Sequence, residues 1–260
     1  MTRRNFNRRP DGPGRGGGAA AIAVAVVVLA GCSQPVGEAQ PTAPVAADWV
    51  MSPMVRSIER TPTALIVKGL AAPQGRVVLH SDGQAAYATG ADAQGRFDLR
   101  ILPPAADTLF AVEARNGQDA SPAPYQLLVS QDPNGPLALL APGAPSVRLD
   151  AAGPLDVIDS DGEAALASGR ATPGAMVSVA VNGGAPIQAR TGRNGRWSVS
   201  LDLAAQASPA TVTVAGRAYD YPGAAVVGSA GLVTTADSAG WRMGWSTRQG
   251  IGQSSWFPRP

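Results

Sequence analysis

The sequence predicts an all-β protein that contains two tandem β-sandwiches. Three observations support this prediction. Apolar and polar residues alternate along short segments, turn residues interrupt these segments at roughly eight- to twelve-residue spacing, and one unit of the pattern occurs twice. No segment that follows the N-terminal leader has a convincing helical period, and residues 203–206 could form one helical turn at most.

The repeated unit relates residues 69–101 to residues 169–201 at a constant offset and without a gap. Gly95-Arg96-Phe97 of the first copy corresponds to Gly195-Arg196-Trp197 of the second, and glycines, prolines and apolar positions match between them. A register kept over this length indicates that the chain contains two copies of one structural unit.

The strands of the unit are clearest in the second copy. Val177 and Val179 face one side of a strand, and residues 197–201 alternate in the same way. Alternation at residues 109–113 and 211–214 predicts a further strand in each copy.

Turn residues separate these strands and explain the phrase that occurs twice. Asn-Gly pairs such as Asn194-Gly195 favour tight turns, because both residues accept positive φ. We expect Gly95 and Gly195 to adopt that conformation. The aromatic residue two positions later, Phe97 or Trp197, is expected to fill the space between two sheets.

The second copy resembles the bacterial Ig-like repeat domains of surface proteins, through Gly169-Arg170-Ala171-Thr172-Pro173-Gly174-Ala175-Met176-Val177 and Asn194-Gly195-Arg196-Trp197-Ser198-Val199. The first copy is degenerate, with Phe97 for Trp and Gln74-Gly75 for Gly-Ala. The resemblance covers roughly residues 60–130 and 145–235. It implies Ig-like β-sandwiches at 56–135 and 145–237, of a kind that serves as spacers and binding platforms.

The N-terminus has the features of an export signal. Arginines precede an apolar run from Ala19 to Ala30, which is too short to span a bilayer core of ~30 Å comfortably. The run ends in Leu29-Ala30-Gly31-Cys32, which resembles the lipobox of bacterial lipoproteins. The resemblance implies a signal peptide at 1–31, cleavage before Cys32 and lipidation of Cys32. Residues 32–55 are rich in Pro and Ala and are expected to form a flexible tether.

The leader leaves the export route open but indicates the compartment. Thr2-Arg3-Arg4-Asn5-Phe6 resembles a twin-arginine signal, and an ordinary Arg-rich signal is the alternative. Ser33 after the lipidated cysteine favours, by family resemblance, the outer membrane of a Gram-negative bacterium. Cys32 is the only cysteine, so an intramolecular disulfide is excluded.

The charge of the mature chain argues against a nucleic-acid partner. The whole chain has 21 Lys and Arg and 19 Asp and Glu. Removal of residues 1–31 takes away five arginines and Asp11, which leaves 16 positive and 18 negative residues and a net charge of −2. No basic excess remains to bind nucleic acid.

Two sets of polar residues are candidates for chemistry. His80 is the only histidine, and its repeat counterpart is Ala180, so we expect it to face solvent. A cluster of carboxylates is spaced like part of a calcium loop but does not match the full pattern, and a polar turn between two strands explains it better. The cluster consists of Asp156, Asp159, Asp161 and Glu163.

The sequence predicts no catalytic residues, no metal-binding residues and no cofactor. A single histidine excludes a metal site with two histidine ligands, and no nucleophile elbow, phosphate-binding loop or paired CxxC motif occurs after the leader. We therefore expect a protein that is not an enzyme.

Residues 238–260 form an aromatic tail with three of the five tryptophans. The tail is expected to form a β-hairpin around Arg248-Gln249-Gly250. The hairpin either completes a sheet of the second sandwich or exposes its aromatic side chains to a partner protein or a glycan. The candidate partner-binding residues are Trp241, Trp245, Trp256 and Phe257.

Together these features predict an envelope lipoprotein, held in the membrane through Cys32, that acts as a structural, adhesive or protein-interaction module. The alternative is a lipoprotein that binds peptidoglycan or a surface glycan with the aromatic residues of the tail.

Overall fold

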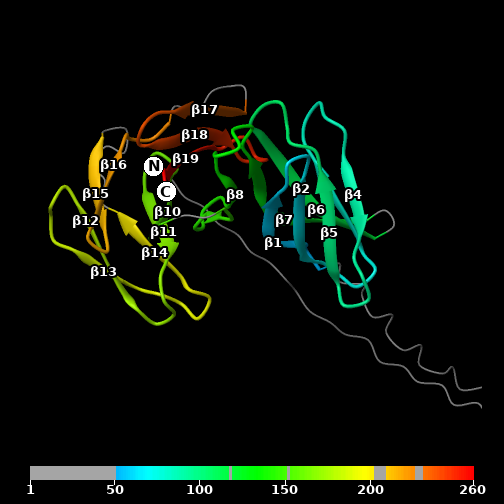
Figure 1. Cartoon of the computed structure of the whole chain (residues 1–260), viewed down its shortest axis with the longest axis horizontal. Coiled ribbons are helices and arrows are strands. Elements are labelled where there is room, and N and C mark those ends of the chain that lie inside the picture. Colours follow the sequence, from blue (N-terminus) through cyan, green and yellow to red (C-terminus); the bar gives the residue numbers. More distant parts are fainter. Residues whose placement is uncertain (1–50, 117–118, 151–152, 202–208, 226–230) are drawn as a thin grey trace, which may run out of the picture. The chain divides into compact units, whose positions relative to one another are not determined.

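The computed structural model of the chain describes residues 51–116, 119–150, 153–201, 209–225 and 231–260 (Figure 1). Every secondary-structure element assigned in these segments is a β-strand, which confirms the predicted all-β class. An apolar helix of membrane-spanning length is absent from the described segments. The signal peptide, Cys32, most of the tether and residues 203–206 lie outside the described residues.

The first sandwich contains nine strands in two antiparallel sheets, ordered β1-β2-β5 and β4-β3-β6-β7-β8-β9. These strands are β1 (Met54–Arg60), β2 (Leu65–Leu70), β3 (Arg76–His80), β4 (Tyr87–Gly90), β5 (Arg96–Ile101), β6 (Thr108–Asn116), β7 (Asp119–Val129), β8 (Leu137–Leu140) and β9 (Val147–Arg148).

The second sandwich also has two antiparallel sheets, ordered β14-β11-β10-β19-β18-β17 and β13-β12-β15-β16. Its strands are β10 (Leu155–Ser160), β11 (Ala165–Arg170), β12 (Met176–Val181), β13 (Ile187–Arg190), β14 (Arg196–Leu201), β15 (Ala210–Val214), β16 (Arg217–Tyr221), β17 (Leu232–Ala236), β18 (Gly240–Ser246) and β19 (Gly252–Pro258).

The two sandwiches share one strand frame, as the sequence repeat predicted. The order β1-β2-β5 recurs as β10-β11-β14, and β4-β3-β6-β7 recurs as β13-β12-β15-β16. The register also recurs, because Gly69 lies opposite Phe97 and Gly169 lies opposite Trp197. Even an irregularity recurs in the first strand of each copy, after Val55 and after Leu155.

Each copy carries different additional strands. In the first copy β8 and β9 extend the sheet beyond β7, and in the second copy β19, β18 and β17 extend the other sheet beyond β10. The hairpin of β18 and β19 turns at Arg248-Gln249-Gly250, where the amide of Thr247 donates to the carbonyl of Ile251 at 2.8 Å. The predicted hairpin is therefore confirmed, and it completes a sheet of the second sandwich.

Each sandwich has a hydrophobic core of its own. Phe97 is 2% exposed in the first core and Trp197 is 3% exposed in the second, as predicted for the aromatic residue of the repeat. Gly95 and Gly195 adopt φ values of 76° and 74°, which confirms the expected turn conformation.

The glycine opposite each aromatic residue leaves room for the ring. A Cβ on Gly169 would overlap the carbonyl oxygen of Pro154 and lie 2.9 Å from the Trp197 ring. A Cβ on Gly69 would lie 2.6 Å from the Phe97 ring. Both copies therefore need glycine at this position, because a larger residue would overlap its neighbours.

Candidate functional site at the junction

A third hydrophobic cluster joins strands of both sandwiches, within the compact unit formed by Asp48–Pro260. Along β7, Leu127 and Val129 belong to the first core, whereas Leu128 between them belongs to this third cluster. The buried members of the cluster, called the junction cluster below, are Leu128, Ala138, Leu140, Val157, Trp241, Met243, Trp245 and Phe257. The predicted domain boundaries stay a prediction, which limited proteolysis would test.

The four aromatic candidates of the tail are core residues. Trp241, Trp245, Trp256 and Phe257 are 2%, 1%, 1% and 0% exposed. Trp256 packs in the core of the second sandwich, and the other three pack in the junction cluster. Their ring faces are covered by protein, so in this structure they do not offer the open surface that stacking on a sugar requires. Of the two expected arrangements of the tail, the structure has the one in which the hairpin completes a sheet, and recognition of a partner by these residues stays a prediction.

Arg148 is the polar centre of the junction. It lies in β9, on the segment that leads from the first sandwich to the second, and its side chain is 0% exposed. Its Nε and Nη2 donate to the Asp150 carboxylate at 2.8–3.1 Å, and its Nη1 donates to the carbonyl of Pro258 at 2.6 Å. A fully buried charge requires such partners, because an unpaired charge is very costly away from water.

Aromatic rings and a second arginine surround this ion pair. The Arg148 guanidinium carbon lies 5.9 Å from the ring centres of both Trp241 and Phe257. Arg259 lies over the Trp241 ring at 4.4 Å. Arginine stacks on aromatic faces better than lysine does, because its guanidinium is planar and weakly hydrated. Trp241 and Phe257 therefore contribute to the junction in two ways: they bury apolar surface, and their rings make cation–π contacts with arginine.

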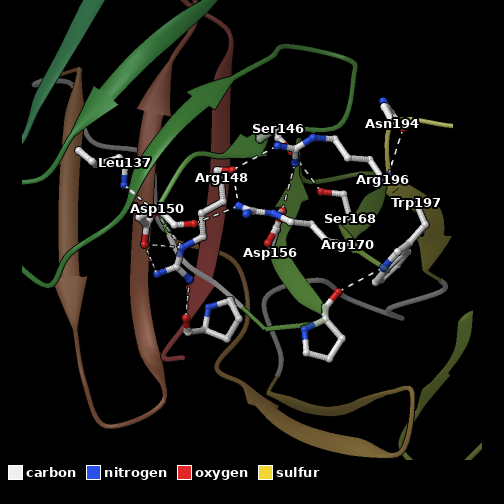
Figure 2. Close-up of polar contacts among 12 residues, drawn as sticks. Leu137, Ser146, Arg148, Asp150, Asp156, Ser168, Arg170, Asn194, Arg196 and Trp197 are labelled. Carbon is white, nitrogen blue, oxygen red and sulfur yellow. Dashed lines mark hydrogen bonds and ion pairs between the residues drawn. The ribbon is translucent and has the colours of Figure 1, made fainter. Parts of the chain in front are cut away.

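A second ion-pair group lies beside the first (Figure 2). Asp156 on β10 accepts hydrogen bonds from Arg170 at 2.8 Å and from Arg196 at 3.2 Å. Arg170 also donates to the carbonyl oxygens of Arg148 and Asp150, at 2.5 Å and 3.1 Å. Burial raises the pKa of the Asp156 carboxyl, and the two guanidiniums oppose that rise. The backbone of the linker, the segment between β8 and β10, is thus bound to the second sandwich through Arg170 on β11.

Asp159 contacts the linker and the hairpin at once. Its carboxylate accepts hydrogen bonds from the Ser146 amide at 2.9 Å and from the Ser255 hydroxyl at 2.6 Å. The Trp245 indole donates to the same hydroxyl at 3.1 Å. Desolvation of this carboxyl raises the pKa of Asp159 to about 6, although its hydrogen bonds act in the opposite direction.

The carboxylates considered for calcium are divided among separate partners. Asp156 and Asp159 serve the contacts described above, and Asp161 accepts the amides of Glu163 and Ala164 at 3.0 Å and 2.8 Å. These amides lower the pKa of Asp161. Residues 161–164 form the turn between β10 and β11, which agrees with the polar-turn interpretation. In the described segments, no three potential metal-ligating side chains gather into a site.

His80 lies on the opposite side of β3 from the core residues Val77 and Leu79, with its side chain 42% exposed, as predicted. Its Nε2 lies 3.7 Å from the Glu113 carboxylate.

Sequence reasoning missed the junction, although one signal for it was present. Leu137-Ala138-Leu139-Leu140 is a continuous apolar run, which is typical of a strand that is buried on both faces. Arg148 and Asp150 gave no such signal, because a charged pair two residues apart resembles an exposed loop.

Comparison with known proteins gives weak similarities only. No family model and no curated protein matches the chain. One similar solved structure comes from a study of how a 1.5-MDa bacterial ice-binding adhesin is retained at the host cell surface, with 12% identity, a TM-score of 0.23, and coverage of 79% of this chain and 63% of that one. Another is a Ca²⁺-stabilised adhesin that helps an Antarctic bacterium bind ice, with 17% identity, a TM-score of 0.20 and coverage of 75% and 60%.

The chain thus spans less than two thirds of the adhesin chains that it matches. Similarities of this strength assign neither a family nor a function.

Proposed function

We propose that the chain is a non-enzymatic module of the bacterial envelope that holds a binding surface away from the membrane. In this proposal Cys32 carries the lipid anchor in the outer membrane of a Gram-negative bacterium, residues 32–55 form the tether, and the two sandwiches form a stiff body.

The junction carries this proposal. Two domains joined by a flexible linker would expose the outer faces of β8 and β10, whereas here these faces contribute Ala138, Leu140 and Val157 to a shared cluster. The donors of Arg148 are directed at Asp150 and at Pro258, so the buried charge joins the linker to the hairpin. Such an interface resembles a domain core more than a transient contact. It supports the proposal that the two sandwiches form one stiff body, which holds a binding surface at a fixed distance.

A distance measurement tests the stiffness of the body. In the Cys32→Ser background, spin labels on Asp98→Cys in β5 and Arg190→Cys in β13 place one probe on an exposed position of each sandwich. We expect one narrow distance distribution. A broad distribution that spans many ångströms would mean that the sandwiches move independently and would contradict the proposal.

The anchor has a test of its own. Processing should be blocked by globomycin, and the wild-type protein should partition into detergent, whereas the Cys32→Ser variant should be recovered without lipid. Globomycin-insensitive processing, or detergent partitioning of Cys32→Ser equal to that of the wild type, would contradict the lipid anchor.

The burial of the tail aromatics does not support the alternative in which they bind peptidoglycan or a glycan. Truncation of residues 240–260 is also a poor test of that alternative, because it removes both β18 and β19, which connect β10 to β17 in the sheet. Loss of sacculus binding after truncation would therefore report unfolding as readily as a lost binding site.

A further inference from the structure

The outer face of the first sandwich contains a cationic hollow on strands β3 and β6. The hollow has a volume of about 550 Å³ and is lined by Arg76, Val78, His80, Ala86 and Arg115. Arg76 on β3 lies directly opposite Arg115 on β6 in the β-ladder, and both side chains are exposed. Side chains in directly opposed positions have Cβ atoms about 4.5–5.5 Å apart, so both guanidiniums can reach one ligand.

The positive charge of the hollow is only partly balanced. Like charges in directly opposed positions destabilise a sheet unless a counter-charge lies nearby. Glu113 supplies one carboxylate, whose Oε1 lies 2.6 Å from Nη2 of Arg115 and 3.7 Å from Nε2 of His80. Arg76 has no ion pair and no side-chain hydrogen bond within the described residues. A cation that protein groups leave uncompensated is available to an external anion.

The second copy of the repeat shows that the fold does not require these charges. On β12, Met176 and Ala180 occupy the positions of Arg76 and His80. Ala215, whose amide donates to the carbonyl of Ser178, occupies the place that Glu113 has beside Val78. The same frame therefore folds with apolar residues at three positions where the first copy has charged or titratable ones.

The net charge of the whole chain would not attract an anionic ligand to this hollow. The chain without its leader has 16 positive and 18 negative residues by the count given above, so its net charge would repel a polyanion weakly. Any binding of an anion at this face must come from local contacts, because charges on other faces are screened beyond about 8–10 Å at ordinary ionic strength.

We propose that this hollow binds the carboxylate of an acidic sugar within an anionic glycan. Arg76 and Arg115 supply planar donor groups that match a carboxylate, and Val78 and Ala86 supply an apolar floor for the face of a sugar ring. The site goes beyond the proposed function and depends neither on the lipid anchor nor on the junction. Phosphate is the other oxyanion that this arrangement could accept, and the test separates the two.

The test uses the full chain with Cys32→Ser and an oligogalacturonate as the probe, in calorimetric titrations at low and high salt. Arg76→Met introduces the residue that the second copy has at the equivalent position. It should weaken binding about tenfold or more, because the variant loses a charge-assisted hydrogen bond to the carboxylate. His80→Ala, also taken from the second copy, should have a smaller effect.

Arg56→Met is the matched control. Arg56 is an exposed arginine on β1, in the other sheet, and its replacement changes the net charge equally. The control should bind within about twofold of the unchanged protein, since non-local surface charge contributes little at ordinary salt. Thermal melts should show that all three variants fold. The second copy folds with Met and Ala at the positions of Arg76 and His80, and Arg56 is exposed.

Several results would overturn the proposal. These are no binding of oligogalacturonate, equal binding of a neutral dextran oligosaccharide, equal losses in Arg56→Met and Arg76→Met, or no loss in Arg76→Met. Binding of inorganic phosphate without binding of oligogalacturonate would overturn the assignment to a carboxylate. The distance measurement across the junction does not depend on any of these outcomes, so failure of one proposal is distinguishable from failure of the other.

Discussion

Neutralising the ion pair of Arg148 and Asp150 one partner at a time should strongly destabilise the protein. Arg148→Met removes the guanidinium and leaves the Asp150 carboxylate, whose side chain is 20% exposed, with the amide of Leu137 as a remaining donor at 3.0 Å. Asp150→Asn keeps an oxygen for that amide but leaves a cation that is 0% exposed without its counter-charge.

The two single variants should therefore differ in magnitude. Breaking a buried pair costs about 3–5 kcal/mol in free energy of unfolding, because one charge remains without compensation. We expect Asp150→Asn to fall within this range and Arg148→Met near its lower end, since water can reach Asp150. The double variant should cost less than the sum of the single ones by about 2 kcal/mol or more, because no buried charge remains.

Urea denaturation followed by tryptophan fluorescence measures these free energies. Lys68→Met is the control, because Lys68 pairs with Glu59 at 3.1 Å while both side chains are largely exposed, at 44% and 63%. An exposed pair of this kind contributes little to the free energy of unfolding, because water and salt screen it. If Arg148→Met were no more destabilising than Lys68→Met, Arg148 would not be a buried structural charge, and the explanation of the junction would be refuted.

Three further predictions follow from the cores. Trp197→Ala should lower the free energy of unfolding by about 3–5 kcal/mol, and a thermal melt that does not shift would place this ring outside the core. Gly169→Ala should destabilise by about 1–3 kcal/mol through overpacking, whereas Gly90→Ala, with no atom within 4 Å of the new Cβ, should be close to neutral by the same urea titration. Because burial raises the pKa of Asp159 to about 6, the folded protein holds this proton more tightly than the unfolded chain, so its contribution to stability should be lost as pH rises from about 4 to about 6, by at most about 3 kcal/mol. Asp159→Asn should flatten the stability profile over that interval, and an unchanged profile would mean that Asp159 does not titrate there.

The parts of the fold that sequence could predict are those with local signals. Alternating apolar residues located the strands of both copies, and the positive-φ glycines and the buried aromatic residues Phe97 and Trp197 follow from the repeated phrase. A local pattern specifies which residues leave water, because one face of a strand is apolar.

The junction could not be predicted in this way, because it depends on residues far apart in the chain. Arg148 and Pro258 are 110 residues apart, and nothing near either of them indicates the other. Trp256 and Phe257 are adjacent, so they point to opposite faces of β19, and both faces are buried. Two adjacent large aromatic residues in a strand are thus a signal that both faces of the strand are covered.

The position of β19 has a consequence for how the protein can be made. Residues 252–258 lie between β10 and β18, so the sheet of the second sandwich cannot be completed until β19 has been synthesised. The first sandwich can fold earlier. Until the β18–β19 hairpin has formed, Leu128 and Leu140 on the outer face of the first sandwich remain exposed to solvent. A chaperone or a protease would therefore meet this surface on chains whose synthesis has not yet reached β19, and for longest on chains that stall before it.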